Sequence, residues 1–509
     1  MFAVIRDKFT RMLENVSGGY INEILYSIIY VLPLIIYSAL ISLGSPLNPL
    51  STSFPHTDAQ VYIYVAESML QGFTPYVDVF DHKGLLLYIL QICGLILGNG
   101  DIWGIWIIIF VSLTTSSVFC YFTVKNIIPS KLGAMTATLL LLTTLDGGSF
   151  AGGDTTEVMG LPFIFVSLYF LSKNIFLDKE IKSIEAVIIG ACLGCVLMIK
   201  ISMAVLWLIL PVYIIIKLCY SRDYRKVLSF LGWGFVGLLL IIVPQIIYLI
   251  NVGAFNEFLN IYLGYNLEYV DRGSLRDGIY TLYGYVTEVQ LILAELVLII
   301  VLASKRTPPK MKAICFVFMT FYVATLLNIS FIGHQYSYYA PIILPCLCVP
   351  FAWLFCWVEH SIGMDVFTLG RVFALLICVS IVGVGGIAST ITNIDTRSIS
   401  EEDERVIELL REHTDSNDTI TVLSNRNYYY LESGRTSASR YSYYIFTNRP
   451  DREKEFLVDL EENRPKVVII GAHVTEDVLT PGIYRYLFDN YKLLESLDRF
   501  NVYVRSHIE

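Results

Sequence analysis

The sequence predicts a polytopic α-helical membrane protein followed by a small α/β domain. Hydrophobic residues make up 55% of the 509 positions and charged residues only 16%. The charges are crowded between long apolar runs, whereas a soluble chain of this length would carry more charge. After residue 395 the sequence becomes polar, so we expect a membrane domain at residues 1–394 and a soluble domain at 395–509.

Eleven apolar segments approach the length of about 20 residues that a membrane-spanning helix needs. They lie near residues 21–43, 101–124, 131–146, 157–172, 184–200, 202–219, 228–250, 279–303, 312–332, 337–358 and 370–391. The first is too long for the apolar part of a secretory signal and lacks a convincing cleavage site. We therefore expect it to be a retained span.

Basic residues alternate strongly between the two sets of loops. One set carries most of the lysines and arginines, while the other carries only Lys83, Lys200, Arg272 and Arg276. The positive-inside rule then places the N-terminus in the cytoplasm, and an odd number of spans places the C-terminal domain outside. This predicts a multi-pass protein of the cell membrane with an extracytoplasmic soluble domain.

The first outer loop, residues 45–100, holds two further helix signals. Thr57-Asp58-Ala59-Gln60 has the form of a capping box, and apolar residues then repeat at helical spacing as far as Met69. We expect a short amphipathic helix along the outer membrane surface, ended near Gly72. Residues 85–97 are apolar but too short to span comfortably, which predicts a second interfacial helix.

The sequence of the C-terminal domain predicts a helix and several strands. Residues 401–413 predict a helix, and residues 419–424, 466–471 and 501–504 predict strands. No phosphate-binding glycine fingerprint is present, so no nucleotide cofactor is expected. Tyrosines and arginines between residues 428 and 444 favour docking against the membrane domain, with stacking on an acceptor glycan as the alternative.

Charge and cysteine usage exclude two other classes. The net charge is -9 and the basic residues lie mostly in short loops, so no nucleic-acid partner is expected. All ten cysteines fall in apolar segments. They predict neither a disulfide framework nor a zinc site, and are interpreted as small core residues.

Chemistry is concentrated in the first outer loop, where carboxylates, histidines and a lysine lie beside the membrane, an expensive place for charge. The pattern comprises Asp58-Ala-Gln-x-Tyr62, then Gly72-x-x-Pro75-Tyr76, then Asp81-His82-Lys83-Gly84-x-Leu86. It resembles the first outer loop of the polyprenyl-phosphate-sugar-dependent glycosyltransferases of the C class. That class includes the protein O-mannosyltransferases and the bacterial aminoarabinose transferase of lipid A.

The resemblance implies a C-class glycosyltransferase fold with about eleven spans, juxtamembrane helices on the outer surface and a site facing away from the cytoplasm. It implies transfer of a hexose or pentose from a polyprenyl-phosphate donor to an extracytoplasmic glycan, lipid or protein. Asp58 matches the essential acidic residue of the family, taken as base or metal contact. Tyr62 and Lys83 match its contacts to the donor phosphate.

The family's second acidic site falls on Asp154 or Glu157, and the sequence leaves open which of them is the functional partner. A divalent metal, Mg²⁺ or Mn²⁺, held by Asp58 and Asp154 is one way to activate the acceptor. Many relatives carry a histidine near a late proline, and here Tyr338 occupies that place while His334 lies four residues earlier. His82 is a further candidate for the donor phosphate.

Elementary chemistry supports the same assignment, because sugar transfer needs a carboxylate for the acceptor proton and cations for the departing phosphate. Purely structural roles for these residues also remain open. Asp58 would also complement a helix N-terminus, and Lys83 would also reach lipid headgroups. Glu288 and Glu295 suit a structural role as well as a cavity border, and Lys200 is a weaker phosphate candidate.

Two other function classes fit parts of the sequence. Intramembrane carboxylates and surface helices also suit a transporter or flippase of a lipid-linked substrate, although no convincing internal repeat is visible. A degenerate relative that serves as a binding or scaffold subunit is the third class, and the tyrosine at position 338 keeps it open.

The alternating loop charges generate the first testable prediction. A reporter enzyme fused after residue 395 is expected to be active only outside the cytoplasm, because the soluble domain should follow an odd number of spans. Activity of a cytoplasm-specific reporter at the same position would overturn both the expected span parity and the outward-facing site.

Overall fold

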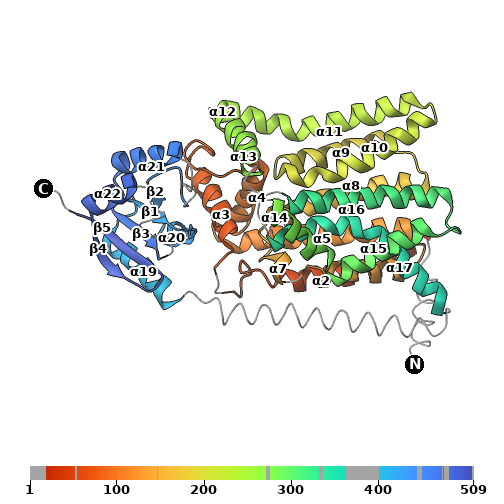
Figure 1. Ribbon diagram of the computed structural model, residues 1–509, viewed down its shortest axis with the longest axis horizontal. Helices are drawn as coiled ribbons and strands as arrows, with labels where there is room; N and C mark the ends of the chain where they lie inside the picture. The colour runs from red at the N-terminus through yellow and green to blue at the C-terminus, as the bar shows by residue number, and fades with distance from the viewer. Residues whose placement is uncertain are drawn as a thin grey trace.

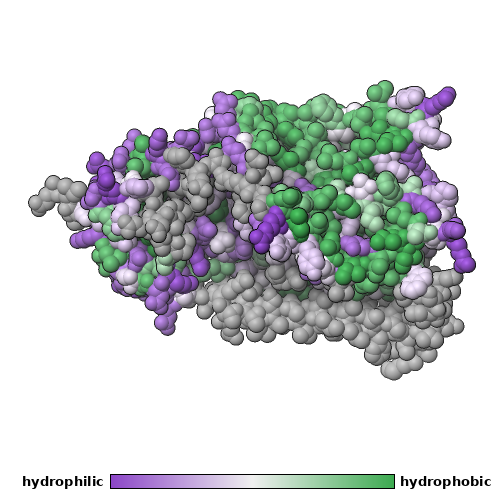
Figure 2. All heavy atoms as spheres, viewed as in Figure 1, coloured by the Kyte–Doolittle hydropathy of each residue, from purple (hydrophilic) through white to green (hydrophobic). Residues whose placement is uncertain are grey.

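The protein was analysed as a computed structural model that describes residues 19–51, 54–145, 147–270, 275–331, 336–362, 400–443, 450–472, 474 and 481–506. Helices of the membrane domain run side by side at one end of an elongated molecule, and the α/β domain forms the other end (Figure 1). The visible helical face is largely apolar, whereas the α/β domain is largely polar (Figure 2).

The membrane domain consists of helices. They are α2 (Gly19–Ser42), α3 (Thr57–Leu70), α4 (Leu85–Leu97), α5 (Trp103–Ile127), α6 (Lys131–Leu142), α7 (Gly147–Phe150), α8 (Thr156–Leu177), α9 (Ser183–Leu197), η1 (Ile201–Ala204), α10 (Val205–Tyr220), α11 (Tyr224–Asn251), α12 (Phe255–Phe258), the π-helix η2 (Leu259–Tyr265), α13 (Asn266–Val270), α14 (Leu275–Val286), α15 (Val289–Ala303), α16 (Pro309–Ser330), η3 (Ser337–Ile343) and α17 (Leu344–Ile362).

Six helices of the described chain are long and apolar enough to cross a membrane, or seven if one bent pair counts as a single span. They are α5, α8, η1 with α10, α11, α16, and η3 with α17 as far as Trp357. The bent pair is α14 and α15, whose axes differ by 79°. The protein is therefore a multi-pass membrane protein, but the expected count of eleven spans is not confirmed.

Helix length explains two of the missing spans. The expected spans 131–146 and 184–200 form α6 and α9, which have 12 and 15 residues. At about 1.5 Å per residue, both fall short of the roughly 30 Å of a hydrocarbon core. The expected span 21–43 coincides with α2, whose side chains are described from Ile28 onward. The expected span 370–391 lies outside the described residues.

Helix α9, which precedes Lys200, packs closely against α11. A Cβ atom on Gly190 would overlap the carbonyl oxygen of Gly234, and one on Gly237 would overlap that of Val187. Because these positions lack side chains, the two backbones approach closely. The short α9 is thereby held beside the longer α11.

The first outer loop forms both expected helices, but α3 differs from the expectation in its surroundings. Nine of its fourteen residues are buried, so it is not an amphipathic helix on the membrane surface. It lies between α4 and the α/β domain, which is called the outer domain after its expected extracytoplasmic position (Figure 1). The expected second helix is found as α4, with the bounds Leu85–Leu97.

The capping of α3 also differs from the predicted capping box. His56 is the N-cap residue, and its Nδ1 accepts the backbone N–H of Asp58 at 3.4 Å. Gln60 instead donates from Nε2 to the carbonyl oxygen of Pro55 and accepts the backbone N–H of Tyr428 with Oε1. The capping box fails because Gln60 is used to dock the outer domain.

The outer domain is a five-stranded sheet with helices around it. Its elements are α19 (Glu401–His413), β1 (Thr419–Leu423), α20 (Tyr428–Ser433), β2 (Thr436–Ser437), α21 (Pro450–Asn463), β3 (Val467–Gly471), α22 (Pro481–Asn490), β4 (Tyr491–Ser496) and β5 (Phe500–Arg505). The strand order is β2-β1-β3-β5-β4. Strand β1 is parallel to β2 and β3, and β5 is antiparallel to β3 and β4. The small α/β sheet confirms the expected class of this domain.

The outer domain docks on α3 and the loop that follows it. Tyr64 Oη accepts the backbone N–H of Ser437 at 2.8 Å. The backbone N–H of Phe80 donates to the carbonyl oxygen of Arg440 at 2.8 Å. The Arg440 guanidinium in turn lies 3.2 Å from Glu257, which belongs to residues 251–278, the second long loop expected on the outer side. This segment of the outer domain therefore touches both outer loops of the membrane domain.

Candidate active site

A cavity of about 800 Å³ lies where the outer domain meets the membrane helices. Its walls come from α3, the loop at residues 81–83, η1, η2, α13, α16 and η3. The outer domain contributes Asn425, which follows β1, and Tyr443. The cavity is therefore assembled from segments that are distant in the chain.

Asp58 lies in the first turn of α3 and lines this cavity. Tyr338 on η3 donates a hydrogen bond from its hydroxyl to Asp58 Oδ2 at 2.9 Å. Among the described residues no hydrogen bond reaches the other carboxylate oxygen, Oδ1, and no cation lies within ion-pair distance. One oxygen is thus held by Tyr338 while the other remains able to accept a proton.

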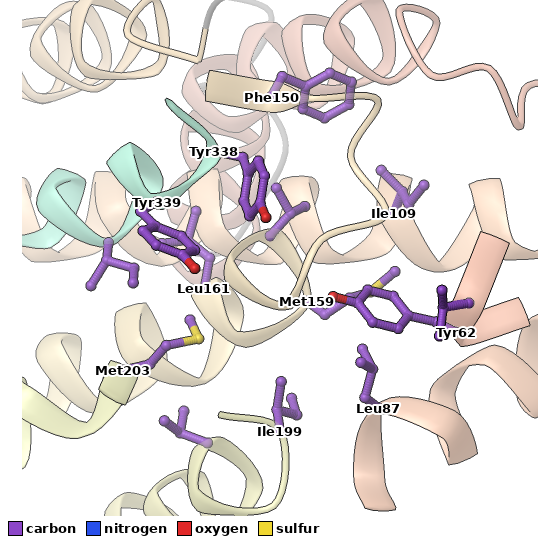
Figure 3. Close-up of a cluster of buried hydrophobic side chains, with 14 of the residues drawn as sticks. Tyr62, Leu87, Ile109, Phe150, Met159, Leu161, Ile199, Met203, Tyr338 and Tyr339 are labelled. Carbon is purple, nitrogen blue, oxygen red and sulfur yellow. The ribbon is translucent and has the colours of Figure 1, made fainter. Parts of the chain in front are cut away.

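Three tyrosine rings frame the start of α8 beside this pair. Tyr62 reaches it from α3, and Tyr338 and Tyr339 reach it from η3 (Figure 3). All three rings are at most 8% exposed. The cavity wall here combines apolar rings with hydroxyl groups, a surface typical of binding sites for sugars and lipids.

Lys83 lines the cavity next to two partners from its own loop. Its Nζ lies 2.6 Å from His82 Nε2, and His82 Nδ1 lies 3.4 Å from the Asp81 carboxylate. Tyr76 donates from its hydroxyl to the backbone carbonyl of Lys83 at 2.8 Å, which fixes the loop. Lys83 Nζ also lies 5.9 Å from the centre of the Tyr62 ring. All of these groups except Tyr76 line the cavity.

The charges in this loop depend on one another. Burial acts to raise the pKa of Asp81, but the charge of Lys83, the adjacent His82 ring and the hydrogen bond from Tyr88 outweigh it and hold this pKa below its usual range. Burial lowers the pKa of Lys83, while Asp81 and Asp58 oppose this shift. Burial and the nearby Lys83 charge lower the pKa of His82, which favours a neutral ring.

A second lysine reaches the cavity from the end of α9. Lys200 Nζ lies 2.6 Å from Glu157 Oε1 and 3.9 Å from the centre of the Tyr339 ring. Thr156 donates from its hydroxyl to the other Glu157 oxygen at 2.8 Å. Lys200 and Thr156 line the cavity, whereas Glu157 is fully buried behind them. Glu157 therefore neutralises Lys200 directly.

Asp154 is buried, and it is absent from the cavity lining. It follows a turn in which Gly152 and Gly153 have φ values of 80° and 82°, a conformation that favours glycine. Gln91 on α4 donates from Nε2 to Asp154 Oδ1 at 2.5 Å. Burial raises the pKa of Asp154 to about 7. Asp154 is thus suited to being a neutral, hydrogen-bonded group behind the site.

Of the eight residues that the sequence motifs assigned to the site, five line the cavity, two do not, and one lies outside the described residues. Those at the cavity are Asp58, Tyr62, His82, Lys83 and Tyr338. Asp154 and Glu157 lie behind the wall, and His334 lies outside the described residues. Glu295 accepts a hydrogen bond from Tyr322 at 2.7 Å, which agrees with the structural alternative for that carboxylate.

Sequence reasoning missed several groups that the fold brings to the site. Tyr339 is one of them, although its neighbour Tyr338 was considered. Asn425 and Tyr443 were missed as cavity residues because they belong to the outer domain. The contact between Tyr339 and Lys200 joins residues far apart in the chain, so it leaves no local pattern in the sequence. Of these two residues, only Lys200 was a candidate from the sequence, because it lies near the expected outer end of a span.

The described residues do not form a good divalent metal site. No group of three or more histidine, cysteine, aspartate or glutamate side chains suited to hold a metal ion occurs among them. Asp154 accepts a hydrogen bond from Gln91 and is absent from the cavity lining that contains Asp58. The expected Mg²⁺ or Mn²⁺ at Asp58 and Asp154 is therefore not confirmed, and no step below is routed through a metal.

Comparison with solved structures defines the class of fold. The crystal structure of ArnT from Cupriavidus metallidurans bound to undecaprenyl phosphate matches with a TM-score of 0.63 at 13% identity, covering 95% of this chain and 98% of that chain. Its apo structure matches with a TM-score of 0.63 at 14% identity, covering 92% and 97%. The protein thus shares the fold of ArnT.

The chain belongs to the family described as “Putative competence-induced protein Ccs4”. The model of the family's N-terminal domain matches residues 22–362, and that of its C-terminal domain matches residues 400–506. No curated protein matches the chain in sequence.

The buried Asp154 generates a prediction about pH and stability. In the unfolded chain this carboxyl has a pKa of about 3.9. In the folded protein, burial raises the pKa of Asp154 to about 7. Between these values the folded state holds the extra proton, so stability falls as pH rises. The difference in melting temperature between Asp154→Asn and wild type should therefore increase in favour of the variant as the pH is raised from about 4 to about 7.

Thermal unfolding in detergent at several pH values measures this difference. Asp78→Asn, at an exposed loop position, is the matched control. Parallel curves for wild type and Asp154→Asn would show that Asp154 is ionised in the folded protein.

Proposed function

We propose that this protein is a membrane glycosyltransferase that moves a sugar from a polyprenyl-phosphate donor to an acceptor on the outer side of the membrane. The observation that carries the proposal is the placement of Asp58 and Lys83 in one cavity at the border of the membrane helices and the outer domain. The same fold in ArnT binds undecaprenyl phosphate, which supports a lipid-phosphate donor.

Asp58 has the features of a general base for the acceptor. Its Oδ2 is held by Tyr338, so that Oδ1 is left to take the proton from an acceptor hydroxyl. The acceptor oxygen then bonds to the anomeric carbon of the donor sugar, and the bond from that carbon to the phosphate oxygen breaks. Such base assistance contributes about 10²- to 10⁴-fold in rate.

Lys83 and Lys200 have the features of a phosphate subsite. The departing polyprenyl phosphate gains negative charge, and both ammonium groups line the same cavity. Lys200 is already paired with Glu157, whereas Lys83 contacts the neutral imidazole of His82. We therefore assign Lys83 as the main cation for the phosphate and Lys200 as a secondary one.

The proposal also covers the substrates, the topology and the remaining site residues. The transferred group is a hexose or pentose, and the acceptor is a glycan, lipid or protein of the cell envelope. The N-terminus is proposed to be cytoplasmic and the domain from residue 395 onward extracytoplasmic. Tyr62 and Tyr338 are proposed to contact the donor, Asp154 and Glu157 to support the site from behind.

Replacing Asp58 tests the assigned base. Asp58→Asn in the full-length protein is expected to lower sugar transfer by about 10²- to 10⁴-fold, because the amide does not accept the acceptor proton. Tyr338→Phe is the matched comparison, since it removes only the hydrogen bond and should cost about tenfold or less. The measurement is transfer of a labelled sugar from polyprenyl-phosphate donors in nanodiscs, with melting temperatures as the fold check.

Near-normal transfer by folded Asp58→Asn would reduce Asp58 to a residue that complements the α3 N-terminus. Movement of a lipid-linked substrate across the bilayer without any transfer would favour the transporter class.

Replacing Lys83 separates phosphate recognition from headgroup anchoring. Lys83→Met keeps the apolar stem but removes the charge, so binding of undecaprenyl phosphate should weaken by about tenfold or more. Lys83→Arg should be intermediate, because the charge is kept. Lys173→Met is the control, since Lys173 pairs with Glu185 away from the cavity. Equal affinity of wild type and Lys83→Met would remove Lys83 from the site.

A further inference from the structure

Lys83 and Lys200 line the same cavity but are compensated differently. Lys200 is in direct contact with a carboxylate, Glu157, at 2.6 Å. Lys83 instead contacts His82 at 2.6 Å, and the carboxylate of Asp81 lies on the far side of that imidazole ring. Among the described residues, no carboxylate lies within ion-pair distance of Lys83.

The tautomer of His82 follows from these two contacts. An ammonium group has only donors, so His82 Nε2 must accept from Lys83 and carry no proton. The proton of the neutral ring is then on Nδ1, which faces Asp81 Oδ1 at 3.4 Å. Asp81 stabilises the charge of Lys83 through the ring and leaves the other two N–H groups of the ammonium for a phosphate.

Asp81 itself is held from two domains. Tyr88 on α4 donates from its hydroxyl to Asp81 Oδ2 at 2.7 Å. Tyr443 of the outer domain donates to Asp81 Oδ1 at 3.4 Å. Asp81 is only 3% exposed, so these hydroxyls replace the water that would otherwise stabilise its charge. The outer domain is thus in contact with the first member of the Asp81–His82–Lys83 series.

The neighbouring residues keep Tyr443 in place. Arg440 bonds through its backbone carbonyl to the Phe80 N–H at 2.8 Å, directly before Asp81 in the chain. Its guanidinium also reaches the carbonyl oxygen of Tyr76 at 3.4 Å and Glu257 at 3.2 Å. Segment 440–443 therefore contacts the loop at residues 76–81, which leads to Lys83.

We propose that Tyr443 of the outer domain is a positioning residue for the phosphate subsite, acting on Lys83 through Asp81 and His82. This inference rests on the proposed function, because it assumes that Lys83 receives the donor phosphate. Docking of the outer domain then prepares the cation as well as closing the cavity. A lipid-phosphate binds best when the outer domain is seated.

The test measures binding of undecaprenyl phosphate to the full-length protein in nanodiscs. Tyr443→Phe keeps the ring and removes the hydroxyl, and is expected to weaken binding by about two- to tenfold. Tyr491→Phe is the matched control. Its hydroxyl donates to the carbonyl oxygen of Pro465 within the outer domain, outside segment 440–443, so its affinity should remain that of wild type.

A double-mutant cycle separates positioning from a general structural effect. Asp81→Asn is expected to weaken binding more than Tyr443→Phe does, because it removes the charge that stabilises Lys83. If Tyr443 acts through Asp81, adding Tyr443→Phe to Asp81→Asn should cause no further loss. If Asp81→Asn does not fold, Tyr88→Phe replaces it, since it removes the other hydroxyl from the same carboxylate and should weaken binding in the same direction.

Two results would overturn the inference alone. One is wild-type affinity in Tyr443→Phe, and the other is a fully additive loss in the double variant, while wild type binds the lipid-phosphate. Absence of binding by wild type itself would overturn the proposed function and this inference together.

Discussion

The structure depends on how charge is stabilised where the membrane helices meet the outer domain. An ionised group removed from water costs several kcal/mol unless a partner or hydrogen bonds replace its hydration. Glu157 meets this requirement by pairing with Lys200, and Asp154 by a raised pKa and a hydrogen bond from Gln91. Asp81 is surrounded by Tyr88, Tyr443 and His82.

Asp58 and Lys83 both line the cavity, and neither has a direct ionic partner among the described residues. Asp58 is held by the hydroxyl of Tyr338, and Lys83 by the imidazole of His82. Neutral partners orient these groups without cancelling their charge, which is the preorganisation that acid–base and phosphate chemistry requires. The more deeply buried carboxylates stabilise the surroundings of Asp58 and Lys83, two groups that face the cavity.

The outer domain is part of the site as well as its cover. Its sheet carries Asn425 at the end of β1 toward the cavity, and its segment 440–443 touches both outer loops. Its tyrosines at 428 and 430 pack against Phe54 and Tyr64 of the membrane domain. Docking is therefore the observed use of this tyrosine-rich region.

The sequence by itself determined what depends on local patterns. Long apolar runs indicated a multi-pass membrane protein, and the spacing within the first outer loop predicted α4 and the helical stretch after Asp58. Strands β1, β3 and β5 were recognisable because short β-branched runs alternate with turns. The motif of the first loop also identified Asp58, Tyr62, His82 and Lys83 as residues that share a site.

Only the tertiary structure decided which partners these residues have and how many helices are long enough to span. Tyr338 is 280 positions from Asp58, and Tyr443 is 362 positions from Asp81. Such pairs leave no periodic signal, because helix and strand periodicities report neighbours within a few residues. Span number likewise depends on where packing ends or bends a helix, as for α6, α9 and the α14–α15 pair. Gln60 shows the same limit, since docking by the outer domain replaced the local cap that its position in the sequence predicted.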